Sequence, residues 1–165
     1  MKSLSVLPNG YDEVVGVYGN PDANNDGVPD PIWKIDNLKL FKFPEPMRIA
    51  WGKHGFVTYF KSHRLVGDVI VDALDEIFDQ IGVLEMRAKT WDYWGGCYCF
   101  RLNSNATPPK LSTHSWAIAC DLNPHLAPNG VKECGQPLQI IRAFKSRGFI
   151  WAAGDWMHAQ ACINF

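Results

Sequence analysis

The chain has 165 residues, of which 47% are hydrophobic and 20% charged, as is typical of one domain with a buried core. With 16 Lys and Arg against 17 Asp and Glu, its formal net charge is -1, which excludes recognition of nucleic acid or an anionic membrane by bulk charge. No apolar run approaches the ~20 residues that span a bilayer, and the N-terminal residues lack the apolar segment of a signal peptide. We therefore expect a single soluble domain over residues 1–165, made in the cytoplasm without nucleic-acid or membrane partners.

Residues 21–31 are rich in Asn, Asp, Gly and Pro, which favour turns, and we expect an exposed loop there. Asp22, Asn24 and Asp26 match the first half of a calcium-binding loop. An EF-hand requires a bidentate glutamate at its twelfth position, where this chain has Trp33. The segment is therefore either a calcium site formed by these three side chains or a plain polar turn.

The clearest predicted helix covers residues 65–81, where apolar residues recur at helical spacing and acidic residues fill the opposite face. Ser62 is the expected N-cap and Gly82 the expected C-cap. This boundary places His63 in the first turn, where we expect a surface or capping residue.

A second helix is expected at 137–147, because proline suits the first helical position and a glycine follows the last turn. Short strands are expected at 97–101, 117–121, 149–151 and 157–163, which are rich in residues that favour strands. Helices and strands do not alternate regularly enough for a parallel fold. The prediction is a small α+β domain with a central antiparallel sheet and flanking helices.

The five cysteines are odd in number and irregular in spacing, and they include no Cys-x-x-Cys pair. This pattern does not favour a disulfide framework. Most are expected to be small core residues in a reducing compartment: Cys97, Cys99, Cys120, Cys134 and Cys162.

Two histidines and an aspartate near the C-terminus have the composition of a catalytic zinc site, which takes three protein ligands and leaves one position for water. These residues are His114, Asp121 and His158. A straight strand would carry Asp121 about 23 Å from His114 and onto the opposite face, so the chain must turn between them. If residues 114–117 form that turn, a strand leaving it can return Asp121 to the metal. Taken singly, each residue is also compatible with an ordinary polar role.

Two further charged residues suit a reaction at such a site. Asp155 precedes His158 by three residues and follows a glycine, which favours a carboxylate beside the metal, where a general base belongs. Arg101 is suited to binding a substrate carboxylate or stabilising an oxyanion. Alone, Arg101 is more typical of a salt-bridged surface residue.

Together these residues resemble the zinc peptidases that cut D-amino-acid-containing bonds in bacterial cell walls. This family includes D-alanyl-D-alanine carboxypeptidases and dipeptidases of the VanY and VanX kind and phage L-alanyl-D-glutamate endopeptidases. The family pattern S-x-H-x-x-G-x-A-x-D, followed by [ED]-x-x-H, is matched at Ser112, His114, Ala119, Asp121, Asp155 and His158. The segments 95–101, 111–116 and 121–124 also look like the short phage members.

The resemblance implies that His114, Asp121 and His158 hold one Zn²⁺ and that Asp155 is the catalytic base. It implies a substrate or transition-state contact for Arg101, and we expect Ser112 and Trp156 to contact substrate as well. Two departures stand out. Ala117 replaces the family glycine, which matters if the turn requires a positive φ, and Trp156 stands where the phage members usually have proline.

The expected function is that of a zinc-dependent peptidoglycan peptidase. We expect a phage or prophage endolysin of the L-alanyl-D-glutamate type, which acts as a monomer on the stem peptide and has no separate wall-binding domain. It would accumulate in the host cytoplasm and act on the cell wall after release. One alternative is a D-alanyl-D-alanine carboxypeptidase or dipeptidase. Another is a non-catalytic wall-binding or virion structural module.

Overall fold

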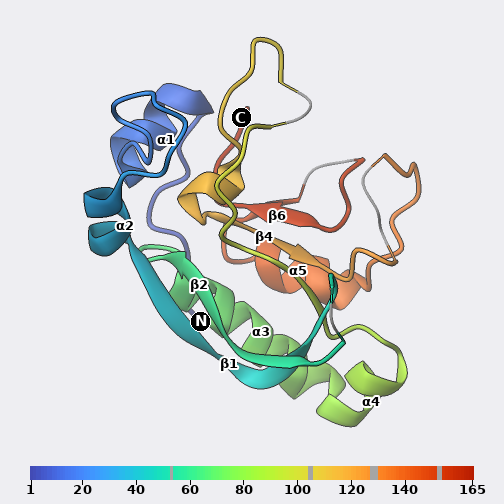
Figure 1. Ribbon diagram of the computed structural model, residues 1–165. Helices are drawn as coiled ribbons and strands as arrows, with labels where there is room; N and C mark the ends of the chain where they lie inside the picture. The colour runs from blue at the N-terminus through green and yellow to red at the C-terminus, as the bar shows by residue number, and fades with distance from the viewer. Residues whose placement is uncertain (53, 104–105, 127–129, 152–153) are drawn as a thin grey trace.

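A mixed six-stranded sheet forms the centre of the molecule (Figure 1), seen in a computed structural model that describes residues 1–52, 54–103, 106–126, 130–151 and 154–165. The strands lie in the order β2-β1-β3-β4-β6-β5. Their bounds are β1 Leu38–Ile49, β2 Phe56–His63, β3 Tyr93–Gly96, β4 Ala119–Leu122, β5 Ile150–Trp151 and β6 His158–Gln160. The helices are α1 Gly10–Tyr18, α2 Pro31–Asn37, α3 Gly67–Ile81, α4 Val83–Ala88 and α5 Leu138–Lys145, with a 3₁₀ helix η1 at Thr113–Trp116.

Neighbouring strands are antiparallel except for β1 and β3, which run parallel. This exception follows from the connection between them, because β2, α3 and α4 intervene and return the chain in the starting direction. The predicted α+β class with a largely antiparallel sheet and flanking helices is confirmed.

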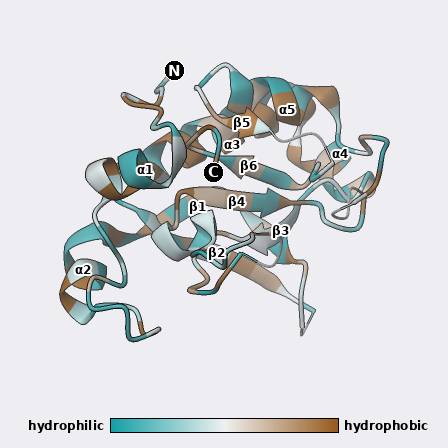
Figure 2. Cartoon of the chain, turned by 90° about the horizontal axis from the view of Figure 1, so that it is seen from above, coloured by the Kyte–Doolittle hydropathy of each residue, from teal (hydrophilic) through white to brown (hydrophobic). Residues whose placement is uncertain are grey.

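Helices α3 and α5 pack against each other and cover one face of the sheet (Figure 2). The predicted helix over 65–81 is confirmed as α3, which ends at Gly82 with φ +86°. Its apolar stripe is fully or almost fully buried: Val69, Ile70, Ala73, Leu74, Ile77 and Phe78. Burial of this stripe supplies the main hydrophobic stabilisation of the helix. Within the described residues, no helix is long and apolar enough to cross a membrane.

The N-terminal boundary of α3 differs from the prediction. The N-cap is Val66, whereas Ser62 and His63 are the last two residues of β2 and are fully buried. The Ser62 hydroxyl donates to the Ala117 carbonyl at 3.0 Å, so tertiary contact rather than helix capping explains this serine. The expectation that His63 lies at the surface is wrong.

The strand predicted at 97–101 is also wrong, because β3 covers Tyr93–Gly96 and ends just before it. The backbone of 97–101 bonds to η1 instead: the Cys99 amide donates to the His114 carbonyl and the Arg101 amide to the Ser115 hydroxyl. The expected strands at 117–121 and 157–163 appear as β4 and the shorter β6, and the expected second helix appears as α5.

The remaining expectations concern the cysteines and the polar loop. All five cysteines are free thiols, and three of them, Cys97, Cys120 and Cys162, are buried as expected, whereas Cys99 and Cys134 are exposed. Residues 23–28 are exposed, as predicted for the polar loop. That loop ends at Asp30, whose carboxylate caps α2 by accepting from the amides of Ile32 and Trp33.

Candidate metal centre

A tight turn between η1 and β4 brings the first candidate ligand next to the second. Ala117 ends η1 in the left-handed region, with φ +54° and ψ +38°. For a non-glycine residue this conformation costs roughly 1–2 kcal/mol, and it is held by hydrogen bonds. The Ala117 carbonyl accepts from the His63 amide and the Ser62 hydroxyl, both at 3.0 Å. The predicted turn over 114–117 is therefore present, and alanine adopts the positive φ.

Antiparallel pairing of β4 with β6 places the second and third candidate ligands opposite each other, because Asp121 and His158 are direct partners in the register. Gly95 on β3 makes room for Asp121 on the other side. A Cβ built on Gly95 would lie 2.8 Å from the Asp121 Cβ, a contact too close for any real side chain. The glycine is thus required by the close approach of the aspartate.

The three side chains present their ligand atoms to a common point. One nitrogen or carboxylate oxygen from each of His114, Asp121 and His158 lies within 4.8 Å of the others. The Nε2 atom of His114 is 3.3 Å from Asp121 Oδ2, and the Nδ1 atom of His158 is 2.9 Å from Asp121 Oδ1. Bonds of about 2.0–2.1 Å to a tetrahedral ion set neighbouring ligands roughly 3.3 Å apart. The spacing therefore fits zinc with little adjustment.

The outer nitrogen of each imidazole is held by a hydrogen-bond acceptor. Nδ1 of His114 lies 2.8 Å from the Cys97 carbonyl, and Nε2 of His158 lies 3.1 Å from Gln160 Oε1. These partners keep the proton on the outer nitrogen, so the inner nitrogen presents a lone pair to the metal. Nε2 of His114 is buried without a hydrogen-bond partner among the described residues, as expected of a ligand atom.

The charge of the cluster also suits a cation. Burial alone would raise the pKa of Asp121, but its hydrogen bond to His158 and the neighbouring imidazoles of His114 and His158 hold it well below its usual range. Burial alone would lower the pKa of His158, yet its hydrogen bond to Asp121 and the charge of that carboxylate raise it. Protonation of His158 and binding of a metal ion at its inner nitrogen therefore compete.

The cleft beside this cluster has a volume of about 340 Å³, and its walls include Arg101, His114, Asp121 and Met157. Burial raises the pKa of Asp155, and the charges of His158, Asp121, His114 and Arg101 all act on it. Asp155 is thus within electrostatic reach of the candidate ligands and of Arg101, which lines the same cleft as His114 and Asp121. A carboxyl with a raised pKa is suited to taking up and releasing a proton.

The other two predicted site residues have different surroundings. The Ser112 hydroxyl caps η1 by accepting from the His114 amide at 3.4 Å, and among the described residues it does not line the cleft. Trp156 is partly buried, its carbonyl accepts from the Trp151 indole at 2.7 Å, and its own indole NH has no partner among the described residues. Substrate contact by either residue stays a prediction.

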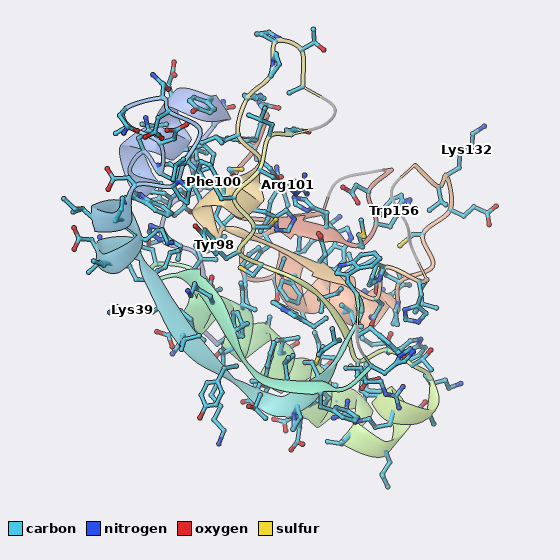
Figure 3. All side chains as sticks on the ribbon, viewed as in Figure 1. Lys39, Tyr98, Phe100, Arg101, Lys132 and Trp156 are labelled. Carbon is cyan, nitrogen blue, oxygen red and sulfur yellow. The ribbon has the colours of Figure 1, made fainter. Side chains whose placement is uncertain are left out.

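Sequence reasoning missed several groups that form the site. Tyr98 and Arg101 both line the cleft, and both belong to the segment between β3 and η1, where Figure 3 labels them. The Tyr98 hydroxyl is buried without a hydrogen-bond partner among the described residues. Trp51 also lines the cleft, with its indole donating to the Gly95 carbonyl at 2.8 Å. No local sequence signal marks either residue. The contact between Gln160 and His158 had one signal in the sequence, because Gln160 follows His158 by two residues and so lies on the same face of the strand.

The calcium hypothesis for the polar loop is not supported. The Asp22 carboxylate accepts from the amides of Asp26 and Gly27, and Asp26 accepts from Val28 and from the Asn24 amide group. These oxygens thus stabilise the turn itself. Among the described residues, the metal-compatible cluster is the one at His114.

Comparison with protein families gives one match that covers all the candidate ligands and Asp155. Residues 105–161 match the family of D-alanyl-D-alanine carboxypeptidase. The match supports a zinc metallopeptidase that acts on peptidoglycan, as the resemblance implied. No curated protein and no solved structure matches the chain.

Proposed function

We propose that the chain is a zinc-dependent endopeptidase that hydrolyses the L-alanyl-D-glutamate bond of the peptidoglycan stem peptide. The observation that carries the peptidase activity is the convergence of His114, Asp121 and His158 within 4.8 Å, inside the segment that matches the carboxypeptidase family. Bound zinc would supply Lewis acidity toward the scissile carbonyl and lower the pKa of the attacking water to roughly 7.

The remaining steps belong to the side chains around the cluster. Asp155 takes the proton from the attacking water and delivers it to the leaving amine. The Arg101 guanidinium binds a carboxylate of the stem peptide and keeps the peptide in register with the metal. The Tyr98 hydroxyl, which has no other partner in the described part of the chain, donates a hydrogen bond to the bound peptide.

The choice of bond is tested by mass spectrometry of the fragments released from purified peptidoglycan. Endopeptidase action at the first stem bond produces fragments with a new N-terminal D-glutamate. Release of free D-alanine would favour the second candidate function, a D-alanyl-D-alanine carboxypeptidase, which the description of the matching family supports.

The catalytic role is tested with Asp155→Asn, which keeps the size of the side chain. We expect kcat to fall by roughly 10²–10⁴-fold while zinc remains bound. If the wild type hydrolyses peptidoglycan no faster than this variant and the chelator-treated protein, with all three at the background rate, a non-catalytic wall-binding or virion structural module is favoured.

The endolysin assignment rests on the likeness of residues 95–101, 111–116 and 121–124 to the short phage members. An enzyme of this kind accumulates in the host cytoplasm and reaches the wall after the inner membrane is breached. Cells that express the chain should therefore lyse when the inner membrane is permeabilised and stay intact otherwise. Lysis without permeabilisation, or no lysis with it, would contradict this assignment.

A further inference from the structure

A second cavity, of about 390 Å³, adjoins the cleft of the candidate metal centre. Trp51 is part of the wall of both, and this residue is 58% exposed. The other residues that line the second cavity are Ala50, Thr90, Tyr93, Pro124 and His125. A ligand that enters the metal cleft past Trp51 would therefore extend into this cavity.

Residues on β3, and on or just after β4, line both cavities. Gly95 and Gly96 on β3 line the metal cleft, and Tyr93 on the same strand lines the second cavity. On β4, Asp121 faces the metal cleft, and His125 follows shortly after the strand ends. At about 3.3 Å per residue, Tyr93 and Gly96 are roughly 10 Å apart. The two cavities thus lie side by side at a fixed short spacing.

The second cavity is lined by aromatic rings and neutral polar groups. The rings of Tyr93 and His125 lie with centroids 4.7 Å apart, and His125 Nε2 is 3.3 Å from the Thr90 hydroxyl. Burial lowers the pKa of His125, which favours its uncharged form. Arg48 lies over the Tyr93 ring at 5.5 Å and pairs with the buried carboxylate of Asp92 at 3.3 Å.

Thr90 adopts a conformation that β-branched residues avoid. Its φ is +59°, and its hydroxyl donates to the Lys89 carbonyl at 2.6 Å. A left-handed β-branched residue is an outlier that persists where the surroundings hold it, commonly at binding sites. Here the conformation keeps the hydroxyl beside His125 at the cavity wall.

We propose that this second cavity is a saccharide subsite that binds an N-acetylated sugar of the glycan strand. This inference rests on the proposed function and extends it to the part of the substrate beyond the peptide. Aromatic faces flanked by neutral hydrogen-bonding groups suit an uncharged sugar ring, which is apolar on its faces and polar at its edge. The carboxylates of the stem peptide would instead lie toward Arg101, in the metal cleft.

The spacing of the cavities also bears on the bond that is cut. The L-alanyl-D-glutamate bond is separated from the sugar by one alanine and a lactyl group. Two such units at about 3.5 Å each, with half the width of a sugar ring, span roughly 10 Å. The terminal D-alanyl-D-alanine bond lies four residues from the lactyl group and, counted in the same way, would place the sugar roughly 20 Å away. A sugar in the second cavity is therefore compatible with cleavage at the first bond.

The subsite is tested by comparing N-acetylmuramyl-L-alanyl-D-glutamate with N-acetyl-L-alanyl-D-glutamate, which has the same bond but no sugar. We expect kcat/KM to be about tenfold higher for the muramyl peptide, the scale of one good aromatic contact. In Trp51→Ala and His125→Ala the ratio of the two kcat/KM values should fall toward one. Trp51→Phe keeps an aromatic face and should retain most of the preference.

Tyr59→Ala is the matched control, because Tyr59 on β2 is 56% exposed, close to the exposure of Trp51, and lines neither cavity. In Tyr59→Ala, the ratio of the kcat/KM values for the two peptides should equal the ratio in the wild type. A ratio near one in the wild type, or a ratio that Trp51→Ala leaves unchanged, would overturn the subsite.

Binding is measured separately from hydrolysis by titrating the protein with chitotetraose and following the Trp51 indole NH signal by NMR. The signal is assigned by its loss in Trp51→Phe. A shift that His125→Ala weakens supports the subsite even if neither peptide is cleaved, in which case the proposed peptidase function alone fails. Cleavage of both peptides at equal efficiency with no indole shift overturns the subsite alone.

Discussion

The Oε1 atom of Gln160 lies 3.1 Å from Nε2 of His158, two residues earlier on the same strand. This contact orients the imidazole so that its Nδ1 atom faces Asp121. The side-chain amide group of Gln160 donates a hydrogen bond to the Cys162 carbonyl at 3.1 Å, and this bond fixes the orientation of the glutamine. The position of the third candidate ligand thus depends on a side chain that does not contact the metal.

Gln160→Leu should weaken zinc binding by about tenfold, the lower end of the range for loss of an outer hydrogen bond to a ligand. The lower end applies because the Thr113 hydroxyl, 3.3 Å from His158 Nε2, remains as a substitute acceptor. Competition with a chromophoric chelator measures the affinity. Gln160→Glu preserves an acceptor and should bind zinc at least as well as the wild type. Equal affinities for the wild type and Gln160→Leu would show that the contact is dispensable.

Gly95→Ala should disrupt the site from the opposite side. The added Cβ would meet the Asp121 Cβ at 2.8 Å and the Asp121 backbone oxygen at 3.2 Å, so β4 or the aspartate must shift. We expect zinc affinity and peptide hydrolysis both to fall by at least tenfold, since a ligand displaced by a fraction of an ångström loses coordination geometry.

Gly16→Ala is the control for this substitution, because a Cβ at Gly16 in α1 meets nothing within 4 Å. That variant should match the wild type in zinc affinity and activity. Wild-type zinc binding by Gly95→Ala would indicate that the close approach does not position Asp121.

The turn at Ala117 predicts opposite responses to two substitutions. Ala117→Val should destabilise the protein by about 3 kcal/mol, because a β-branched residue is strained in the left-handed region and the site is fully buried. Ala117→Gly should change the free energy of unfolding by less than about 1 kcal/mol. Relief of backbone strain is offset there by loss of a buried methyl group and by a freer unfolded chain.

Urea unfolding of the chelator-treated proteins measures both changes. A valine variant as stable as the wild type would contradict the strained turn. Ala117 can therefore stand in place of the family glycine, because four hydrogen bonds formed by its amide and carbonyl hold the turn at positive φ.

The sequence predicted those features that depend on local pattern. The helical spacing over 65–81 needed no tertiary information, and the candidate ligands His114, Asp121 and His158 followed from their residue types together with the family resemblance. The long strand β1 gave no such signal because it contains Pro44 and Pro46, and its pairing with β2 is irregular between Lys42 and Met47.

Other features depended on contacts between distant segments. The segment 97–101 has strand-forming residues, but the carbonyl of Cys97 bonds to His114 and the amide of Cys99 to the His114 carbonyl. His63 is buried because its ring contacts Tyr18 from α1. Trp51 and Tyr98 reach the cleft through the fold alone, so no spacing rule could identify them.

Burial of His63 predicts a specific loss of stability in acid. Its Nδ1 atom accepts from the Leu65 amide and its Nε2 lies 3.3 Å from the Tyr18 carbonyl, an arrangement that requires a neutral ring. Burial lowers its pKa to about 4 from an ordinary value of 6.5. Between these values the unfolded chain binds a proton that the folded protein does not, so the free energy of unfolding falls as the pH falls from 6.5 to 4.

The slope from this one group is about 1.4 kcal/mol per pH unit. His63→Gln cannot take up the proton, so its stability should fall less steeply over this window when both proteins are unfolded in chelator. Parallel pH profiles for the two proteins would show that His63 is not the titrating group. At pH 7 and above, where the ring is neutral in both states, the two profiles should run parallel.

The central claim is that hydrolysis depends on one metal ion held by His114, Asp121 and His158. The most direct test is the initial rate of peptidoglycan hydrolysis by chelator-treated protein as zinc is added back. The rate should rise from near zero and reach its plateau at one zinc per chain, and His158→Ala should remain inactive throughout the titration. A rate that is unaffected by chelator and zinc, or a fully active His158→Ala protein, would contradict the account.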